Sequence, residues 1–245
     1  MNSPQLHPLQ VNPKTGEPFL NLPNRDGLNI ILTPPRTSDI DEMVAVHSDE
    51  RVYYWLTGTP QPYTAANAKW WLEENAIPEA QKALAALEAA RDKPELILVD
   101  SCPVTIIRQV KEDGTDTLVG GLDFTLARRE FELDGTGWEP SDVLSAPQRL
   151  PDKPDIWTVG YYVAPSHHGL GLMSSAFKTV LDAWGIPRMG IRSLRVSALT
   201  GNTGSLRVFE KNGLTLYKSW PEDTVDVRGT RKSGVVIYER NLDVM

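Results

Sequence analysis

The sequence predicts a mixed α/β or α+β fold, because short apolar runs typical of strands alternate with segments of helical periodicity. The chain has 245 residues, of which 40% are hydrophobic and 23% charged, as is ordinary for a globular domain. It has no window of about 18 consecutive apolar residues, so we expect no membrane span. We predict one domain over residues 28–245, preceded by a Pro- and Asn-rich arm or tail over residues 1–27.

The first part of this domain predicts a strand followed by helices. Residues 28–32 (LNIIL) form a short apolar run that two prolines end. The segment TSDIDEMVAVHSD starts with capping residues and then repeats one helical face, at Ile40, Met43, Val44 and His47. Thr64 suits the N-cap of a helix over TAANAKWWLEE. We expect Pro78 to interrupt that helix and to lie in the first turn of an Ala-rich one.

The middle of the chain predicts a hairpin, a long loop and a strand. Residues 104–110 and 117–126 are apolar runs on either side of the turn signal EDG, which indicates a β-hairpin. Residues 127–154 are rich in Gly and Pro, and loops of this length are usually functional, so we predict a lid. Residues 156–163 form the next strand.

The last part predicts the clearest helix, over residues 172–184. One apolar face repeats along it, at Met173, Ala176, Phe177, Val180, Leu181 and Trp184. A strand over residues 194–199 follows, and then a helix that Asn202 caps and Gly213 ends. Two strands, at residues 214–218 and 235–240, close the chain.

The stretch YVAPSHHGLGLM joins a strand to that clearest helix, and three interpretations compete for it. A metal site lacks ligands, because the chain has four histidines and one cysteine, and the adjacent His167 and His168 point in opposite directions in an extended segment. A backbone cradle for an anion fits better, because Gly169 and Gly171 precede a helix N-terminus. A tight turn without chemistry stays open from the loop alone.

The loop does not match either of the common nucleotide motifs. The spacing of the phosphate-binding G-x-x-x-x-G-K-[ST] motif is absent. The dinucleotide fingerprint needs a third glycine where Ser174 stands. An oxidoreductase that uses a nucleotide cofactor is therefore disfavoured.

About 30 residues beyond the loop comes NTGSLRVFEKNGL, which starts at Asn202. The ordered pair V-x-P-x-x-x-G-x-G and N-x-x-S…K-x-G resembles the GCN5-related N-acetyltransferase (GNAT) superfamily, and most closely its RimJ/RimL-like branch. Members carry GYxVxPxxxGxG…A, here GYYVAPSHHGLGLMSSA, and later NxxSxxxxEKxGF, here with Leu214 in place of Phe. The segment PPRTSDIDEMVAVHSDERVYYWL is similar to their first helical element, so the resemblance covers roughly residues 28–242.

The resemblance implies a fold and an activity. It implies a central, mostly antiparallel sheet of six to seven strands flanked by about four helices. It also implies an acetyl-CoA-dependent N-acetyltransferase that moves an acetyl group to a primary amine by direct attack in a ternary complex. The acceptor would be a protein N-terminus or a small-molecule amine.

The resemblance also implies cofactor-binding residues. The pyrophosphate is expected on backbone N–H groups of the loop, at His168, Gly169, Leu170, Gly171, Leu172 and Met173. The pantetheine arm is expected along the backbone of Tyr161, Tyr162 and Val163. Further along the chain, Asn202 would reach the cofactor and Ser205 would lie near its sulfur.

The catalytic assignments that follow are Asn202, Ser205 and Asp123. Asp123 lies on a strand expected to border the substrate cleft, where its carboxylate could act as the base. Asp155, Glu130 and an ordered water are alternatives. Two alternatives involve no catalysis: Asn202 could serve only as a helix N-cap, and Asp123 could be an outward-facing residue of its strand.

Four positions depart from the pattern of the superfamily. Ser166 stands where Gln or Arg is frequent, and Ser175 where many relatives have Glu. Thr158 replaces a Glu that can serve as base, and Phe209 replaces a Tyr that acts as acid in other branches. A GNAT-fold protein that binds CoA or another ligand without turnover is therefore the alternative, and an unrelated α/β domain with a structural loop is a third hypothesis.

Composition bears on compartment and partners. The single cysteine, Cys102, excludes an internal disulfide and favours a reducing compartment, so we expect a cytoplasmic protein. The net charge of −7 argues against nucleic acid as a partner. An exposed edge among the last strands would allow self-association, so monomer and homodimer both stay open.

Overall fold

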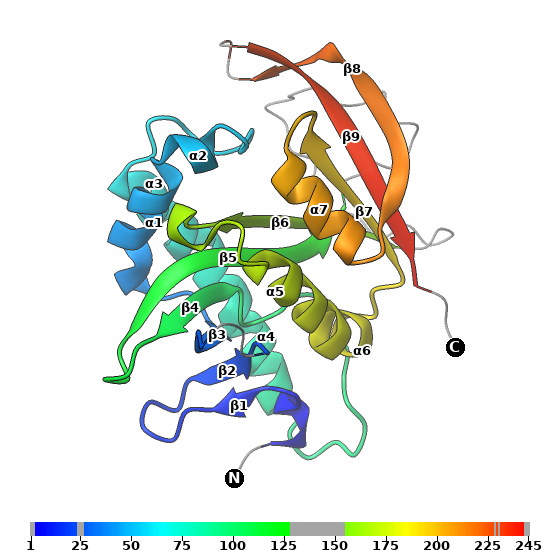
Figure 1. Ribbon diagram of the computed structural model, residues 1–245. Coiled ribbons are helices and arrows are strands. Elements are labelled where there is room, and N and C mark those ends of the chain that lie inside the picture. Colours follow the sequence, from blue (N-terminus) through cyan, green and yellow to red (C-terminus); the bar gives the residue numbers. More distant parts are fainter. Residues whose placement is uncertain (1–2, 24–26, 128–154, 228, 230, 243–245) are drawn as a thin grey trace. The chain divides into compact units, whose positions relative to one another are not determined.

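The computed structural model of the chain describes residues 3–23, 27–127, 155–227, 229 and 231–242. The chain divides into two units, each assembled from two stretches of sequence: Met1–Asp123 with Tyr161–Gly190, and Phe124–Gly160 with Ile191–Met245. Strands β5 and β6 contribute residues to both units (Figure 1). Residues 128–154, which hold most of the predicted lid, lie outside the described residues.

The first unit contains antiparallel strands in the order β1-β2-β3-β4-β5. Their bounds are Gln10–Val11, Pro18–Asn21, Ile30–Thr33, Ile106–Val110 and Asp116–Leu126. The predicted hairpin is confirmed: the Lys111 N–H donates to the Thr115 carbonyl at 2.8 Å, and Gly114 adopts a φ of +84° in the turn between β4 and β5. Strand β6 (Ile156–Val163) runs beside β5, where the Ala164 N–H donates to the Val119 carbonyl at 2.8 Å.

The first unit has two short helices and two long helical runs. The shorter helices are α1 (Ile40–His47) and α2 (Glu50–Tyr53). The long runs are α3 (Ala65–Trp71) continuing into α4 (Ile77–Ala89), and α5 (Leu172–Val180) continuing into α6 (Ile186–Met189). Thr64 caps α3 as the sequence predicts, because its hydroxyl accepts from the Asn67 N–H at 3.3 Å.

Pro78 lies in the first turn of the Ala-rich helix α4, as the sequence predicts, but it does not interrupt the run that starts with α3, contrary to the expectation. Residues Leu72–Ala76 form a turn of π-helix, in which the Ile77 N–H donates to the Leu72 carbonyl five residues earlier. Residues Leu181–Gly185 form a second π turn, directly before Ile186 and Pro187. Both prolines thus follow a widened turn, which accommodates a residue that has no N–H and a bulky ring. The helix continues past each proline as a result.

The core of the first unit confirms the two predicted helical faces. Of the face predicted for α1, Met43 and His47 are buried, and Ile40 and Val44 are partly buried against the core. The predicted face of the second long run is wholly buried, at Met173, Ala176, Phe177, Val180, Leu181 and Trp184.

The N-terminal segment is attached to the first unit by a buried arginine. Arg188 is 1% exposed, and its Nη1 donates to the carbonyls of Gln5 at 2.6 Å and His7 at 2.8 Å. The Gln5 side chain in turn donates to the carbonyls of Lys93 and Glu95 and accepts from the Ile97 N–H. The segment that the sequence predicts as an arm or tail therefore supplies acceptors to a buried cation.

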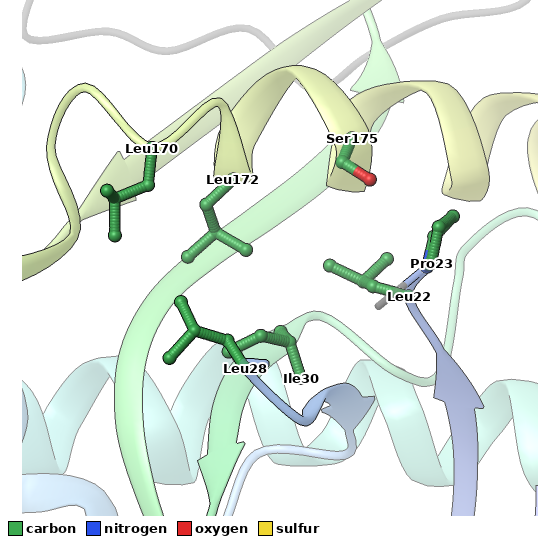
Figure 2. Close-up of a pocket in the computed structure, with 7 residues that line it drawn as sticks. All are labelled: Leu22, Pro23, Leu28, Ile30, Leu170, Leu172 and Ser175. Carbon is green, nitrogen blue, oxygen red and sulfur yellow. The ribbon is translucent and has the colours of Figure 1, made fainter. Parts of the chain in front are cut away.

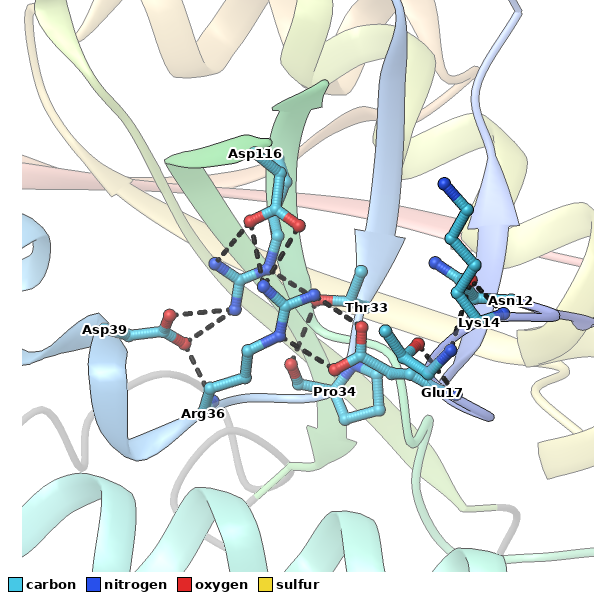
Figure 3. A network of polar contacts seen from close by, with 10 residues as sticks. Asn12, Lys14, Glu17, Thr33, Pro34, Arg36, Asp39 and Asp116 are labelled. Atoms are coloured by element: carbon cyan, nitrogen blue, oxygen red, sulfur yellow. Dashed lines mark hydrogen bonds and ion pairs between the residues drawn. The ribbon is translucent and has the colours of Figure 1, made fainter. Parts of the chain in front are cut away.

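A network of charged residues joins β2–β5 (Figure 3). Arg36 donates to Glu17 at 2.8 Å through Nε and to Asp116 at 2.8 Å through Nη1. Arg108, which is fully buried, donates to both oxygens of Asp39 at 2.8 Å and to Thr33 Oγ1 at 2.6 Å. Each guanidinium therefore has a carboxylate partner, as burial of charge requires.

The second unit has strands in the order β6-β7-β9-β8. Strand β6 pairs in parallel with β7 (Ser193–Leu199). Strand β9 (Arg231–Asn241) pairs antiparallel with β7 on one side and with β8 (Thr215–Val227) on the other. Helix α7 (Thr203–Lys211) precedes β8, and its Phe209 packs on Tyr238 with ring centroids 5.6 Å apart.

The mixed α+β class with mostly antiparallel strands is confirmed. The described residues form nine strands, compared with the six to seven expected, and the two without a sequence prediction are β1 and β2. Strands β8 and β9 also extend well beyond the predicted residues 214–218 and 235–240. The extensions contain Pro221, Gly234 and several charged residues, which give little strand signal.

Candidate functional site

The loop between β6 and α5 needs glycine at two positions. Gly169 has a φ of +77° and Gly171 a φ of +71°, both in the left-handed region that other residues rarely adopt. Gly171 is also the N-cap residue of α5. A Cβ atom at Gly169 would meet no other atom within 4 Å, so the backbone there borders open space. The turn predicted from G-L-G is thus present and open on one side.

The N-terminus of α5 offers donors to an anion. The first N–H groups of any α-helix lack acceptors within the helix. Gly171 brings no side-chain oxygen to cap those groups, and the first turn of α5 contains no acidic residue. The N–H groups and the positive end of the helix dipole favour a phosphate or another anion at this position.

The two histidines brace this loop. His167 is buried, with Nε2 3.1 Å from Gln109 Oε1 and Nδ1 2.9 Å from Ser166 Oγ. Burial lowers the pKa of His167, which favours its neutral form. His168 is exposed, and its Nε2 donates to the Val163 carbonyl at 2.8 Å. Both rings therefore bind neighbouring groups of the protein.

An apolar pocket lies directly beside the loop (Figure 2). Leu170 and Leu172 point from the loop and the start of α5 towards Leu22, Leu28 and Ile30 of the N-terminal segment and β3. Pro23 and Ser175 complete the lining. A glutamate at position 175, which many relatives carry, would face this apolar lining, so the serine suits its surroundings.

Strand β6 leads into the loop, and its described pairing with β7 lies at the start of the strand. The described parallel pairing joins Ile156 with Ser193 and Trp157 with Leu194. The strand then continues to Val163, through Tyr161 and Tyr162. All three of these predicted pantetheine residues are partly exposed, and they belong to the same unit as the glycine loop.

Asn202 and Ser205 belong to the second unit. The predicted cap is confirmed, because Asn202 Oδ1 accepts from the Ser205 N–H at 3.1 Å. Both side chains are partly exposed, so each keeps polar atoms at the surface of its unit. Phe209, four residues further on, is 2% exposed and forms part of the core.

Candidates for proton transfer are placed as follows. Asp123 on β5 and Asp155 before β6 are partly buried, in the first and second unit respectively. Glu130 lies outside the described residues. Cys102 is buried, which together with the nearby charge of Asp123 raises the pKa of its thiol to about 12 and keeps it inert at neutral pH.

Sequence inspection missed a set of rings behind β6. The Tyr162 ring contacts His47 at a centroid distance of 4.3 Å, and His47 stacks on Tyr63 at 4.6 Å. The pair Gly120–Gly121 on β5 lies against Tyr162. The two adjacent glycines could have indicated this contact from the sequence, because glycine inside a strand often marks a place where another group approaches the backbone closely.

The fold and the loop together place two glycines with positive φ at the N-terminus of α5, in the loop that follows strand β6. The family model described as the acetyltransferase (GNAT) domain matches residues 29–215. The chain belongs to this family. It is therefore an acyltransferase whose cofactor is acetyl-CoA.

Solved structures with the same fold agree with this membership. An acetyltransferase of the GNAT family from Bacillus anthracis is 13% identical with a TM-score of 0.57, over 91% of this chain and 98% of that one. RimL, a ribosomal L7/L12 α-N-protein acetyltransferase in complex with coenzyme A, is 14% identical with a TM-score of 0.54, over 91% and 99%. The microcin C7 self-immunity acetyltransferase MccE, in complex with acetyl-CoA and AMP, is 11% identical with a TM-score of 0.56, over 87% and 92%.

No curated protein matches this chain significantly. In the part of the chain that the structure describes, no helix is long and apolar enough to cross a membrane. The residues of the loop suit the pyrophosphate of acetyl-CoA, because Gly169 and Gly171 have positive φ and a Cβ atom at Gly169 would meet no other atom within 4 Å.

Proposed function

We propose that this protein is an N-acetyltransferase that transfers the acetyl group of acetyl-CoA to a primary amine by direct attack within a ternary complex. The acceptor is a protein N-terminus or a small-molecule amine. One observation carries the proposal: two glycines with positive φ lead from strand β6 into the N-terminus of α5, which has no side-chain cap. That combination suits a pyrophosphate followed by an extended arm.

Each segment of the first unit has a role in holding the cofactor. The backbone N–H groups of residues 168–173 hold the pyrophosphate. The backbone of Tyr161, Tyr162 and Val163 pairs with the amides of the pantetheine arm, as an added strand would. The Val163 carbonyl already accepts from His168, so this bond fixes the end of the edge. Asn202 and Ser205 of the second unit are proposed as further cofactor ligands, on the resemblance of their motif.

The reaction requires a proton to leave the amine. An alkylammonium has a pKa of about 10, so a base must accept a proton before nitrogen can attack. We assign that role to the Asp123 carboxylate, directly or through a water. The bound cofactor supplies an activated acyl carbon, and a backbone N–H of β6 donates to the developing oxyanion. As the C–N bond forms, the C–S bond would break; the Ser205 hydroxyl would donate a hydrogen bond to the departing sulfur, and CoA would leave as the thiol with the second proton of the amine.

Cofactor binding is tested first, by thermal unfolding with and without acetyl-CoA. A ligand present at 100 times its Kd stabilises the folded state by about 2.7 kcal/mol, which raises the Tm by several degrees. Gly171→Ala is expected to weaken the effect, because it strains the left-handed N-cap. Gly114→Ala is the matched control, because Gly114 also has a positive φ and lies in a distant hairpin turn. No shift of the wild-type protein at millimolar acetyl-CoA would contradict the proposal.

Turnover is tested separately, by release of free CoA over a panel of amines and N-terminal peptides. Asp123→Asn and Ser205→Ala should lower kcat while the shift with acetyl-CoA persists. A protein that binds acetyl-CoA but acetylates no member of the panel would support the second candidate, a CoA-binding protein without turnover. The specific observation in favour of that candidate is a buried Phe209 where other branches use a tyrosine as acid.

A further inference from the structure

The ring of Tyr162 lies across Gly121 on the neighbouring strand β5. A Cβ atom added to Gly121 would be 2.8 Å from Tyr162 Cε1 and 3.0 Å from Cζ. A Cβ atom added to Gly120 would be 2.6 Å from the Tyr162 carbonyl oxygen. Real Cβ atoms do not approach other atoms so closely, so these two positions admit only glycine while Tyr162 keeps its place.

The Tyr162 ring also contacts His47, which in turn stacks on Tyr63. Tyr162 and His47 have ring centroids 4.3 Å apart at 58°, and His47 and Tyr63 are 4.6 Å apart at 25°. We name Tyr63, His47 and Tyr162 the ring column. His47 is held at the end of α1, because its Nδ1 lies 2.9 Å from the Met43 carbonyl. Gln61 Nε2 also donates to the His47 carbonyl at 3.1 Å.

Packing alone sets the position of the Tyr162 ring. Its hydroxyl is buried and has no hydrogen-bond partner among the described residues. A buried hydroxyl without a partner contributes nothing to stability and costs its desolvation. The position of the ring therefore depends on its contacts with Gly121 and His47.

We propose that Gly121, His47 and Tyr63 are positioning residues for acetyl-CoA. They clamp Tyr162 and so fix the backbone of β6 that, in the proposed function on which this inference rests, pairs with the pantetheine arm. Position 121 then controls cofactor binding through its size, although its own atoms contact no part of the cofactor. A methyl group there pushes the Tyr162 ring and shifts the edge that the cofactor requires.

The test is the Kd of acetyl-CoA, measured by titration calorimetry without an acceptor. Gly121→Ala is expected to raise the Kd by roughly tenfold or more. Gly58→Ala is the matched control, because a Cβ there meets no atom within 4 Å and its φ is not positive, and its Kd should equal that of the wild type. The double variant Gly121→Ala with Tyr162→Val removes the clash and should bind more tightly than Gly121→Ala alone.

Two variants of Tyr162 keep the inference testable if Gly121→Ala does not fold. Tyr162→Phe keeps the ring, so its Kd should stay well below that of Tyr162→Val. Tyr162→Val removes the ring and should raise the KM for acetyl-CoA, while the KM for the amine stays unchanged. A purely structural role would lower the Tm of these variants without moving the Kd.

The outcomes separate this inference from the proposed function. If the wild-type protein binds no acetyl-CoA, the proposed function fails and the inference fails with it. If the wild type binds but Gly121→Ala or Tyr162→Val binds equally well, the inference alone is overturned. A Tyr162→Phe variant that loses binding would also overturn it, because the hydroxyl rather than the ring would then be responsible.

Discussion

Two buried histidines, His47 and His167, make the stability of the first unit sensitive to pH. Burial lowers the pKa of both rings from the ordinary value of 6.5. Below pH 6.5 the unfolded chain therefore binds protons that the folded protein does not, and the free energy of unfolding falls as pH falls. Above that pH neither state binds these protons, and the histidines add no pH dependence.

We therefore expect the free energy of unfolding, measured by urea denaturation, to be flat from pH 8 to about 6.5 and to decrease below it. The variant His167→Gln, which keeps a polar side chain near Gln109, should show a smaller decrease between pH 6.5 and 5.5. An unchanged decrease in a double variant at His47 and His167 would contradict this assignment.

Arg108 and Asp39 form the most deeply buried ion pair described, with both residues 1% exposed. Asp39→Asn removes the nearer of the two carboxylates that balance the guanidinium, since Asp116 lies 3.6 Å away, and breaking a buried pair in this way costs about 3–5 kcal/mol. The surface pair Lys178–Asp182 is the control: Asp182→Asn should cost less than about 1 kcal/mol. Thermal and urea unfolding of the two variants, side by side, measure the difference. Equal losses would show that the buried pair is dispensable.

Among the elements, helix α7 begins at Asn202, which caps the helix and for which we also propose a role in cofactor binding. Asn202 caps the helix through the Ser205 N–H, and it is also a proposed cofactor ligand. Asn202→Ala should lower the free energy of unfolding by about 1 kcal/mol, because it leaves an N-terminal donor without its cap. Asn202→Asp keeps a good cap and should retain that stability. Its Kd for acetyl-CoA then reports the cofactor role by itself, and an unchanged Kd would count against that role.

The sequence predicts an element best when the interactions that form it join residues close together in the chain. Capping by Thr64 and Asn202, and the apolar face from Met173 to Trp184, involve neighbours a few residues apart, and the structure confirms them. The continuation of a helix through Pro78 was not predicted, because a π turn depends on tertiary packing.

The same distinction explains which parts of the candidate site could be predicted from the sequence. Positive φ at Gly169 and Gly171 follows from the residue type and its place before a helix, so the loop could be predicted. The contact of Gly121 with Tyr162 depends on how β5 and β6 lie side by side. No local pattern encodes that contact, so the ring column emerged only from the structure.

In the molecule as a whole, the N-terminal segment and α6 depend on each other. Deletion of residues 1–9 removes two backbone acceptors from Arg188 and leaves a buried guanidinium with fewer partners. We expect a loss of about 2–4 kcal/mol, because hydrogen bonds to a charged group contribute about 1.5–3 kcal/mol each and water replaces part of them. Arg188→Met in the shortened protein should recover some of that loss, because it removes the charge. A shortened protein with the Tm of the full chain would contradict the dependence.

The division of the chain also determines when it can fold during synthesis. The Gln5 carbonyl and the Arg188 guanidinium that binds it are 183 residues apart in sequence. A ribosome that adds about 5–20 residues per second needs about 10–40 seconds to cover that distance. During that interval the first residues emerge without their partner, and Gln5 offers its acceptors to water or to a chaperone. The second part of the first unit covers Tyr161–Gly190, so a fragment that ends before α6 lacks part of this unit. Fragments for expression therefore need the whole span to Gly190, which also carries Phe124–Gly160 of the second unit.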